Sequence, residues 1–491
     1  MKTVKTIQTV EKVISICSWL ILMLFLTGTV LAQEPDQKDD AAVYGIRQVR
    51  ITHSCDPAVP SPQSQAAANA IPCATTQIFP PLTNGQPTTN SVWSQDISWF
   101  NPVTKKYYLA DRNNFGIDIV DVTNDMVLTV ATGTPLFAFV GNRAAANSSG
   151  PNGVLVTNNP HQIWAGDGDS TVKVFNLNKG GDTATPLTSI ATGGVLRADE
   201  LAYDPDDQLI LVANDDNSEL FVTFISVSAN KAGIGVVGKI SFLGPNPANC
   251  PMGGCATDGI EQPVYDHGTG MFYLAVPQTT GHPNGEIAVI DPKMKKVVNV
   301  FGLTDVNNNP IPCLPHGLTL GPRQQLLLGC SADVDDVNFP SGRPLVSIVI
   351  SAIDGRLVFL TNKVGGSDEV WFNPGDNTYY LAASSWQLDK SSPPQGFICP
   401  SPTQPQPPNC PTTAAPVLGI IDAGSDADGP EFIQNIKTAP GAHSVAAIFY
   451  PSEKSSKKPG DKDFINKVYV PLRVTPAINE TGGFGVVGRI P

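Results

Sequence analysis

The sequence predicts an all-β fold, a seven-bladed β-propeller, because one small β-unit recurs along the chain. Six stretches begin with an acidic residue or a histidine, continue as a short strand, and end in a turn that comes later in the last stretch than in the others. These stretches are residues 96–102, 199–205, 261–266, 316–322, 368–374 and 443–451. A period of roughly 40 to 60 residues built from short strands is typical of propeller blades.

Further strand-like segments follow each of these stretches. The second strands are expected at 107–110, 163–166, 209–213, 272–276, 326–329, 379–383 and 468–472. The third strands are expected at 117–122, 171–175, 220–224, 286–290, 346–350 and 417–421. Aromatic and β-branched residues separated by Asn, Asp, Gly and Pro are typical of strands joined by tight turns. Counting the second strands predicts seven blades.

The second blade is predicted to begin at Asn152 rather than at His161. Residues 163–175 match the second and third strands of the next blade closely, so residues 154–157 become the first strand. Asn152 then occupies the repeated polar position, and His161 falls in a hairpin turn on the opposite face.

The last blade lacks a fourth strand at its C-terminal end. Residues 444–450, 467–472 and 484–490 supply only three strands. We expect residues 44–51 to add the fourth, which would close the ring and leave no open sheet edge. The propeller is therefore predicted to span residues 43–491.

The N-terminal residues 1–32 resemble a secretory signal peptide, with a basic start, a long apolar run and a cleavage site near Ala32. An uncleaved membrane anchor is the alternative. Residues 33–42 are expected to be a disordered mature N-terminus. Removal of three lysines and one glutamate changes the net charge from −13 to −15. Such an acidic, secreted or periplasmic protein is a poor candidate for binding nucleic acid or, after cleavage, an anionic membrane.

Eight of the nine cysteines lie in the mature chain, as near neighbours in sequence. An even number of cysteines in an exported chain indicates disulfides. Because each pair falls within one loop or hairpin, we expect sequential pairing, with metal ligation by thiolates as the alternative. The predicted pairs are Cys55–Cys73, Cys250–Cys255, Cys313–Cys330 and Cys399–Cys410.

One face of the predicted ring gathers polar residues. In a blade, the starts of first strands and the turns between second and third strands lie on the same side of the disc. That side collects Asp96, Asn152, Asp199, Glu261, His316, Asp368 and His443 around the mouth of the axial channel. Long loops lie there too, including a proline-rich insert at 387–415 that the Cys399–Cys410 bond would staple. Binding sites commonly form on such loops.

Carboxylates and imidazoles at one mouth are candidate ligands for a divalent cation, with Ca, Zn and Mn as the candidate metals. Glu261, His316 and His443 form a mixed set suited to Zn or Mn. A purely acidic set suited to Ca consists of Asp96, Asp199, Glu261 and Asp368. The alternative is that these polar residues only line a hydrated channel. Three further acidic residues, Asp111, Asp167 and Asp215, are expected mainly to hold their own tight turns.

The repeats resemble the secreted seven-bladed propellers of the YVTN and lactonase-like superfamily. The resemblance rests on the segments 108–114, 164–175 and 197–205 and covers most of residues 40–490. The resemblance implies a seven-bladed propeller fold. It does not imply one activity, because the superfamily includes lactonases, lyases and binding proteins.

Two classes of function remain open from the sequence. The first is a metal-dependent, lactonase-like hydrolase or lyase acting on a small polar substrate, in which Glu261, Asp199 or His316 moves a proton beside the cation. The second is a non-catalytic propeller that binds a small polar ligand or a protein partner over the loop-rich face.

Overall fold

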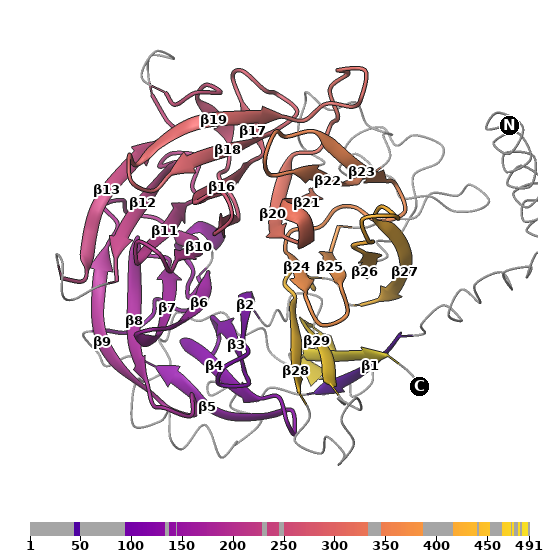
Figure 1. The fold of residues 1–491 in the computed structure, drawn as a ribbon. Coiled ribbons are helices and arrows are strands. Elements are labelled where there is room, and N and C mark those ends of the chain that lie inside the picture. Colours follow the sequence, from indigo (N-terminus) through magenta and orange to yellow (C-terminus); the bar gives the residue numbers. More distant parts are fainter. Residues whose placement is uncertain are drawn as a thin grey trace, which may run out of the picture. The chain divides into compact units, whose positions relative to one another are not determined.

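The chain forms a ring of β-sheets around one axis (Figure 1). The computed structural model describes residues 44–49, 94–132, 137–143, 145–227, 233–244, 250–331, 345–385, 416–438, 441–451, 464–472, 474–475, 480–481 and 484–489. These residues include seven four-stranded sheets, so the predicted all-β, seven-bladed propeller is confirmed. The predicted signal peptide, the segment 33–42, the insert 387–415 and the cysteines Cys55, Cys73, Cys399 and Cys410 lie outside the described residues.

Blades one to four follow the chain in order. Blade one contains β2 (Gln95–Asn101), β3 (Lys106–Asp111), β4 (Gly116–Asp121) and β5 (Met126–Thr132). Blade two contains β6 (Val154–Asn158), β7 (His161–Asp167), β8 (Thr171–Leu177) and β9 (Ala184–Ala191). Blade three contains β10 (Ala198–Asp204), β11 (Leu209–Asn214), β12 (Phe221–Ser226) and β13 (Gly235–Ser241). Blade four contains β15 (Pro263–Asp266), β16 (Met271–Val276), β18 (Glu286–Asp291) and β19 (Lys296–Gly302).

Blades five to seven complete the ring. Blade five contains β20 (Pro315–Leu320), β21 (Gln325–Cys330), β22 (Ser347–Ser351) and β23 (Leu357–Thr361). Blade six contains β24 (Val370–Asn373), β25 (Thr378–Ala383), β26 (Val417–Asp422) and β27 (Glu431–Lys437). Blade seven contains β28 (Ala446–Pro451), β29 (Phe464–Pro471), β32 (Phe484–Arg489) and β1 (Tyr44–Val49). Two small ladders pair β14 (Ala256–Asp258) with β17 (Gln278–Thr279) and β30 (Val474–Thr475) with β31 (Glu480–Thr481).

Packing between blades explains why the second strands are rich in aromatic residues. The first strands of neighbouring blades contact one another around the axis, and the second strands lie just outside them. Tyr273 on β16, for example, packs with Leu326 and Leu328 on β21 of the next blade. Burying such large rings between sheets is the main stabilising force in this kind of repeat. Among the described residues, no helix is long and apolar enough to cross a membrane.

The ring is closed at blade seven, where the strand β1 joins strands from the C-terminal part of the chain. The order of strands there is β1, β32, β29 and β28, so the N-terminal strand fills the outer position, as expected from the sequence. The first and last blades also contact each other directly: Tyr107 stacks on Tyr469 with ring centroids 4.7 Å apart. Close to the axis, the Ser98 amide donates to Ser444 Oγ at 2.9 Å.

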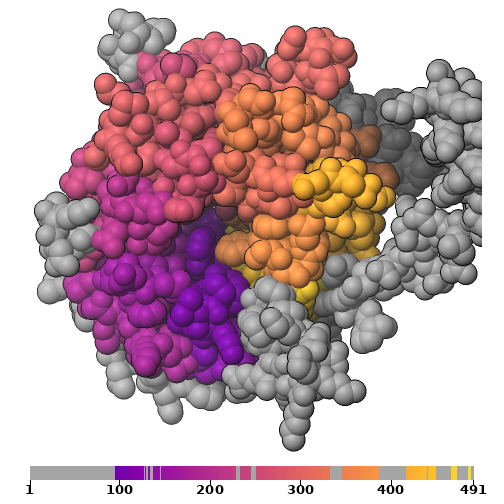
Figure 2. Space-filling model, in the orientation of Figure 1, coloured from indigo at the N-terminus to yellow at the C-terminus, as the bar shows by residue number. Residues whose placement is uncertain are grey.

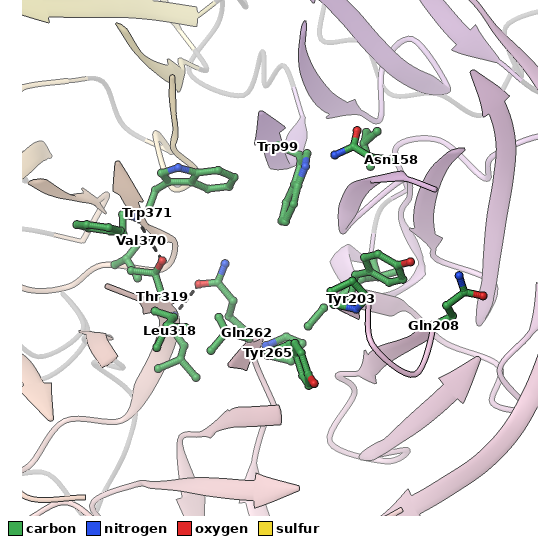
Figure 3. Close-up of a pocket in the computed structure, with 18 of the residues that line it drawn as sticks. Trp99, Asn158, Tyr203, Gln208, Gln262, Tyr265, Leu318, Thr319, Val370 and Trp371 are labelled. Carbon is green, nitrogen blue, oxygen red and sulfur yellow. Dashed lines mark hydrogen bonds between the residues drawn. The ribbon is translucent and has the colours of Figure 1, made fainter. Parts of the chain in front are cut away.

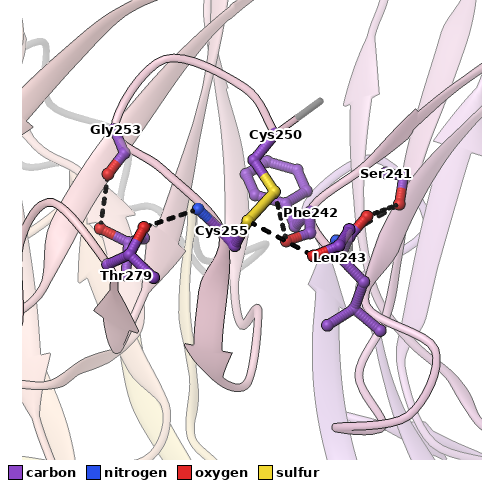
Figure 4. The surroundings of a disulfide bond; sticks show 9 residues. Ser241, Phe242, Leu243, Cys250, Gly253, Cys255 and Thr279 are labelled. Atoms are coloured by element: carbon purple, nitrogen blue, oxygen red, sulfur yellow. Dashed lines mark hydrogen bonds between the residues drawn. A yellow bond between two sulfur atoms is a disulfide. The ribbon is translucent and has the colours of Figure 1, made fainter. Parts of the chain in front are cut away.

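Two of the predicted disulfides are present in the described part of the chain. Cys250–Cys255 closes the loop between β13 and β14 (Figure 4). The Cys255 amide donates to Thr280 Oγ1. Cys313–Cys330 joins the segment before β20 to the end of β21. Both bonds confirm the sequential pairing, and the second one anchors the strand that carries His316.

We expect loss of Cys313–Cys330 to destabilise the fold more than loss of Cys250–Cys255. The pairs are 17 and 5 residues apart. In the chain-entropy model, these separations correspond to about 3 and about 2 kcal/mol. Cys313 and Cys330 are also buried in the core between blades four and five. Chemical denaturation of the two double Cys→Ala variants measures the difference, and equal losses would contradict the expected order.

Candidate functional site

A repeated β-bulge directs the polar residues toward the axis. In β2, β10 and β20, the register shifts by one residue close to Asp96, Asp199 and His316. Blade four shows the same pattern, because the Glu261 amide donates to the Ala275 carbonyl while the Ala275 amide donates to the Gln262 carbonyl. A bulge leaves one extra residue on one strand and re-aims its side chain. The repeated polar position is therefore a repeated backbone feature.

Arg112 neutralises one part of the mouth. Its guanidinium forms a buried ion pair with Asp96 and donates to Asn152 Oδ1 on the next blade. His443 Nε2 lies 3.0 Å from the other oxygen of Asp96, and its Nδ1 lies 2.9 Å from the Gly441 carbonyl. Burial favours the protonated acid, but Arg112 and His443 outweigh burial and hold the pKa of Asp96 at about 2.

Arg197 neutralises a second part of the mouth. Its Nε lies 3.1 Å from Asp199 Oδ2, and its Nη2 forms an ion pair with Asp215. Burial raises the pKa of Asp199 to about 7, because Arg197 only partly offsets burial and the repulsion from Asp96 and Asp215. A carboxyl group with such a pKa exchanges its proton near neutral pH.

Glu261, His316 and Asp368 form the third part of the mouth, and within the described part of the chain no ion pair joins them to Arg112 or Arg197. His316 Nδ1 lies 3.5 Å from Glu261 Oε1 and 3.5 Å from Asp368 Oδ1. One ligand atom from each residue lies within 4.8 Å of the others. The Glu261 side chain is 9% exposed and that of Asp368 is 41% exposed, so the cluster has a buried end and an end open to solvent.

The charges in this cluster depend on one another. Burial lowers the pKa of His316, but Glu261 and Asp368 outweigh burial and raise it to about 10. Burial raises the pKa of Glu261 well above its usual range, and Asp215 adds to that effect. The protonated form of His316 is therefore favoured beside Glu261 and Asp368.

Local backbone features surround two of the three side chains, Glu261 and His316. The Ile260 amide donates to Asp215 Oδ1 at 3.0 Å, which orients the strand that starts with Glu261. Gly259 has a φ of 51°, and a Cβ there would lie 2.9 Å from Glu261 Oε1, so a larger residue would crowd the carboxylate. Leu314, two residues before His316, also has a positive φ of 52° and follows the disulfide residue Cys313.

A second polar layer lies one residue further along the first strands. Glu200 and Glu369 are both buried and close enough for each carboxyl group to shift the pKa of the other. Burial raises the pKa of Glu369 to about 8 and that of Glu200 well above its usual range. Gln262 Nε2 donates to Glu369 Oε2 at 2.6 Å. This layer separates the charged mouth from the remainder of the channel.

The structure brings together three of the six predicted metal ligands. Glu261, His316 and Asp368 form the cluster, whereas Asp96 pairs with Arg112 and His443, and Asp199 pairs with Arg197. The mixed set with His443 and the purely acidic set are thus not gathered around one point by the described side chains. Of the predicted catalytic residues, Glu261 and His316 belong to the cluster, and Asp199 lies beside Arg197.

Neither Arg112 nor Arg197 was predicted as part of the site. Both were visible in the sequence, because Arg112 follows Asp111 in a turn and Arg197 precedes Asp199 by two residues. Asp215 was expected mainly to hold its own turn, whereas it joins the mouth through Arg197 and Ile260. By contrast, Asp111 accepts the amides of Asn113 and Asn114, as expected of a turn residue.

Comparisons with known proteins support the fold alone. No family model and no curated protein matches the chain. Hydrazine synthase from Kuenenia stuttgartiensis is similar with a TM-score of 0.50 and 12% identity, covering 84% of this chain and 99% of that one. A chain of a mitotic checkpoint complex gives 0.47 and 11%, covering 86% and 96%. The WD40 repeats of RRP9 give 0.47 and 10%, covering 80% and 94%. The resemblance to the YVTN and lactonase-like superfamily stays an expectation.

Proposed function

We propose that this protein is a ligand-binding propeller whose charged mouth holds a divalent cation through Glu261, His316 and Asp368. One observation carries the proposal: Nδ1 of His316 lies 3.5 Å from an oxygen of each carboxylate. Two ligand atoms at about 2.1 Å from one tetrahedral ion lie about 3.4 Å apart. A charge-assisted hydrogen bond is shorter, at about 2.7 to 2.9 Å.

The ligand types favour zinc or manganese over calcium. Calcium takes six to eight oxygen ligands, whereas an imidazole with two carboxylates is a set that zinc and manganese accept. Arg112 and Arg197 pair with Asp96 and Asp199, two of the four carboxylates in the acidic set suited to calcium. Three protein ligands leave a fourth position for water or for a ligand.

The His316→Gln and Glu261→Gln variants are expected to lose zinc affinity. The loss should exceed the roughly 10- to 100-fold drop in affinity that follows when a residue that only hydrogen-bonds to a metal ligand is replaced. Isothermal titration of the purified protein with ZnCl₂, and separately with MnCl₂ and CaCl₂, measures it. His267→Gln is the matched control. His267 lies in the turn directly after β15, is exposed, and pairs with Asp206. Wild-type protein that binds no zinc, or a His316→Gln variant that binds as tightly, would refute the site.

A hydrolytic role is the second candidate, and the pKa of Asp199 at about 7 favours it. A carboxylate with a pKa near the working pH can take a proton from a water bound to the cation. A screen of lactones and esters with zinc-loaded protein, with and without chelator, tests this role. Metal-dependent turnover that falls in Asp199→Asn supports it. If zinc binds but no substrate turns over, the protein is a binding propeller.

We further propose that the protein is exported. The support is the pair of disulfides, Cys250–Cys255 and Cys313–Cys330, since such bonds persist in oxidising compartments. Cleavage after Ala32 would start the mature chain at Gln33. N-terminal sequencing of protein recovered from the medium or periplasm checks both points, and a start at Met1 would contradict cleavage.

A further inference from the structure

A cavity of about 630 Å³ occupies the end of the axial channel opposite the charged mouth (Figure 3). Side chains alternate along a strand, so the residues one and three positions after the repeated polar residue both face the axis. In blade four these are Gln262 and Val264, and in blades one and six the third position holds Trp99 and Trp371. Figure 2 shows a hollow at the centre of the ring.

The walls of this cavity are aromatic and aliphatic. Trp99 and Trp371 meet edge to face, with centroids 5.2 Å apart, although they belong to blades one and six. Blade seven, which lies between them, places the buried Ala446 and Ala447 on its first strand. These small residues leave room for both indoles. Tyr203 on β10 adds a third ring to the lining.

Gln262 supplies a directional polar group at the inner end of the cavity. Its Oε1 accepts the Leu318 amide at 2.6 Å, and its Nε2 donates one proton to Glu369 Oε2 at 2.6 Å. A glutamine amide carries two protons, so these bonds fix the orientation and leave the second proton to a ligand. In Figure 3 this amide points into the cavity. The described residues that line the cavity include no acidic or basic side chain.

We propose that this cavity binds a neutral, planar, mainly apolar small molecule that presents a carbonyl or similar acceptor to Gln262. Its volume falls in the usual range for small-molecule sites, roughly 300 to 1,000 Å³, which are mostly apolar with a few oriented polar groups. Faces and edges of indole and phenol rings favour flat ligands. A charged ligand would lose its hydration without a compensating charge.

This site is separate from the proposed cation site. Asp199 at the charged mouth and Tyr203 at the cavity lie four residues apart on β10, which is about 13 Å along a strand. The buried Glu200 and Glu369 lie between the two ends. Occupation of the cavity should therefore not depend on metal.

The test uses Nile red, a neutral, planar dye with a carbonyl group, whose fluorescence rises in apolar surroundings. We expect saturable, one-to-one binding to the full chain, unchanged by EDTA. Val264→Trp should fill the cavity and weaken binding at least tenfold. Val195→Trp is the matched control, because Val195 is 72% exposed and is not among the cavity residues. Fluorescein, a flat anion, should not bind.

Each outcome bears on the proposal. Absence of saturable binding, equal affinity of Val264→Trp and wild type, or tighter binding of fluorescein than of Nile red would overturn it. If Val264→Trp unfolds, Trp371→Leu replaces it, with thermal melting as the check on folding and weakened Nile red binding as the expected result. Because EDTA is present in the Nile red titrations, their result does not depend on whether the protein binds a cation at the charged mouth.

Discussion

The Arg112→Met variant is expected to lose about 3 to 5 kcal/mol of unfolding free energy. Removing Arg112 takes away the guanidinium that pairs with buried Asp96 and leaves His443 as the remaining partner of that carboxylate. Losses of this size follow when one partner of a buried ion pair is removed. Arg112 is 5% exposed and Asp96 is 6% exposed, so water cannot replace the guanidinium without rearrangement. Urea denaturation followed by tryptophan fluorescence measures the loss.

Two further variants test the cause. Arg112→Met combined with Asp96→Asn removes the buried charge and should recover at least half of the loss, because replacing both partners is much less costly than removing one. Arg356→Met is the matched control, since Arg356 is exposed and should change stability by less than about 0.5 kcal/mol. A double variant as unstable as Arg112→Met would indicate that lost packing, rather than charge, is responsible.

The acid limb of stability gives an independent check. The pKa of Asp96 is about 2 in the folded protein, below the ordinary value of about 3.9. Its stabilising effect is therefore present above about pH 4 and is lost as the pH falls toward 2. Without Arg112, the pKa of Asp96 rises, so this part of the acid-induced loss should disappear from the pH profile of the variant.

The ring of polar residues could be predicted because it follows from a local repeat. In all but the last of the six stretches the polar residue lies at a similar distance before a turn, and the same bulge recurs in blades one, three and five. Matching the strands of neighbouring blades predicted that Asn152, and not His161, occupies the repeated polar position, and the structure confirms it. Asn152 Oδ1 accepts a hydrogen bond from Arg112 at the charged mouth. His161 is the first residue of β7, at the opposite end of the blade.

The charge balance of the mouth could not be predicted in the same way. The sequence shows four acids that could converge, Asp96, Asp199, Glu261 and Asp368, and their mutual repulsion suggested a cation. Arg112 reaches Asp96 on its own blade and Asn152 on the next, so its role depends on how closely neighbouring blades pack. That spacing is a property of the closed ring, whereas a single repeat contains no information about it.

The cavity could not be predicted from the sequence, for a related reason. Trp99 and Trp371 occupy equivalent positions in two repeats, and that match was visible in the sequence. Whether such rings fill the channel or leave a cavity depends on the opposing residues. Here Ala446 supplies almost no volume between them. Side-chain volume summed around an axis is a global quantity, so it required the assembled blades.

Deletion of residues 44–49 is expected to open blade seven and to lower the stability of the ring by about 3 to 6 kcal/mol. The strand β1 lies next to β32 at the outer edge of that blade, so its loss removes a ladder of backbone hydrogen bonds, each worth about 0.5 to 1.5 kcal/mol. The exposed edge of β32 would also be free to pair with other chains. Thermal melting and light scattering measure both effects, with deletion of residues 34–39 as a control of equal length.

The inner contacts between the first and last blades determine how far the ring opens. Tyr107 stacks on Tyr469, and Ser98 bonds to Ser444, without any part of β1. The deletion should therefore leave a folded but less stable propeller, and a synthetic peptide of residues 41–51 should restore the melting temperature by taking the vacant strand position. A deletion variant that melts with the control, or one that the peptide does not rescue, would show that these inner contacts close the ring and that β1 only covers its edge.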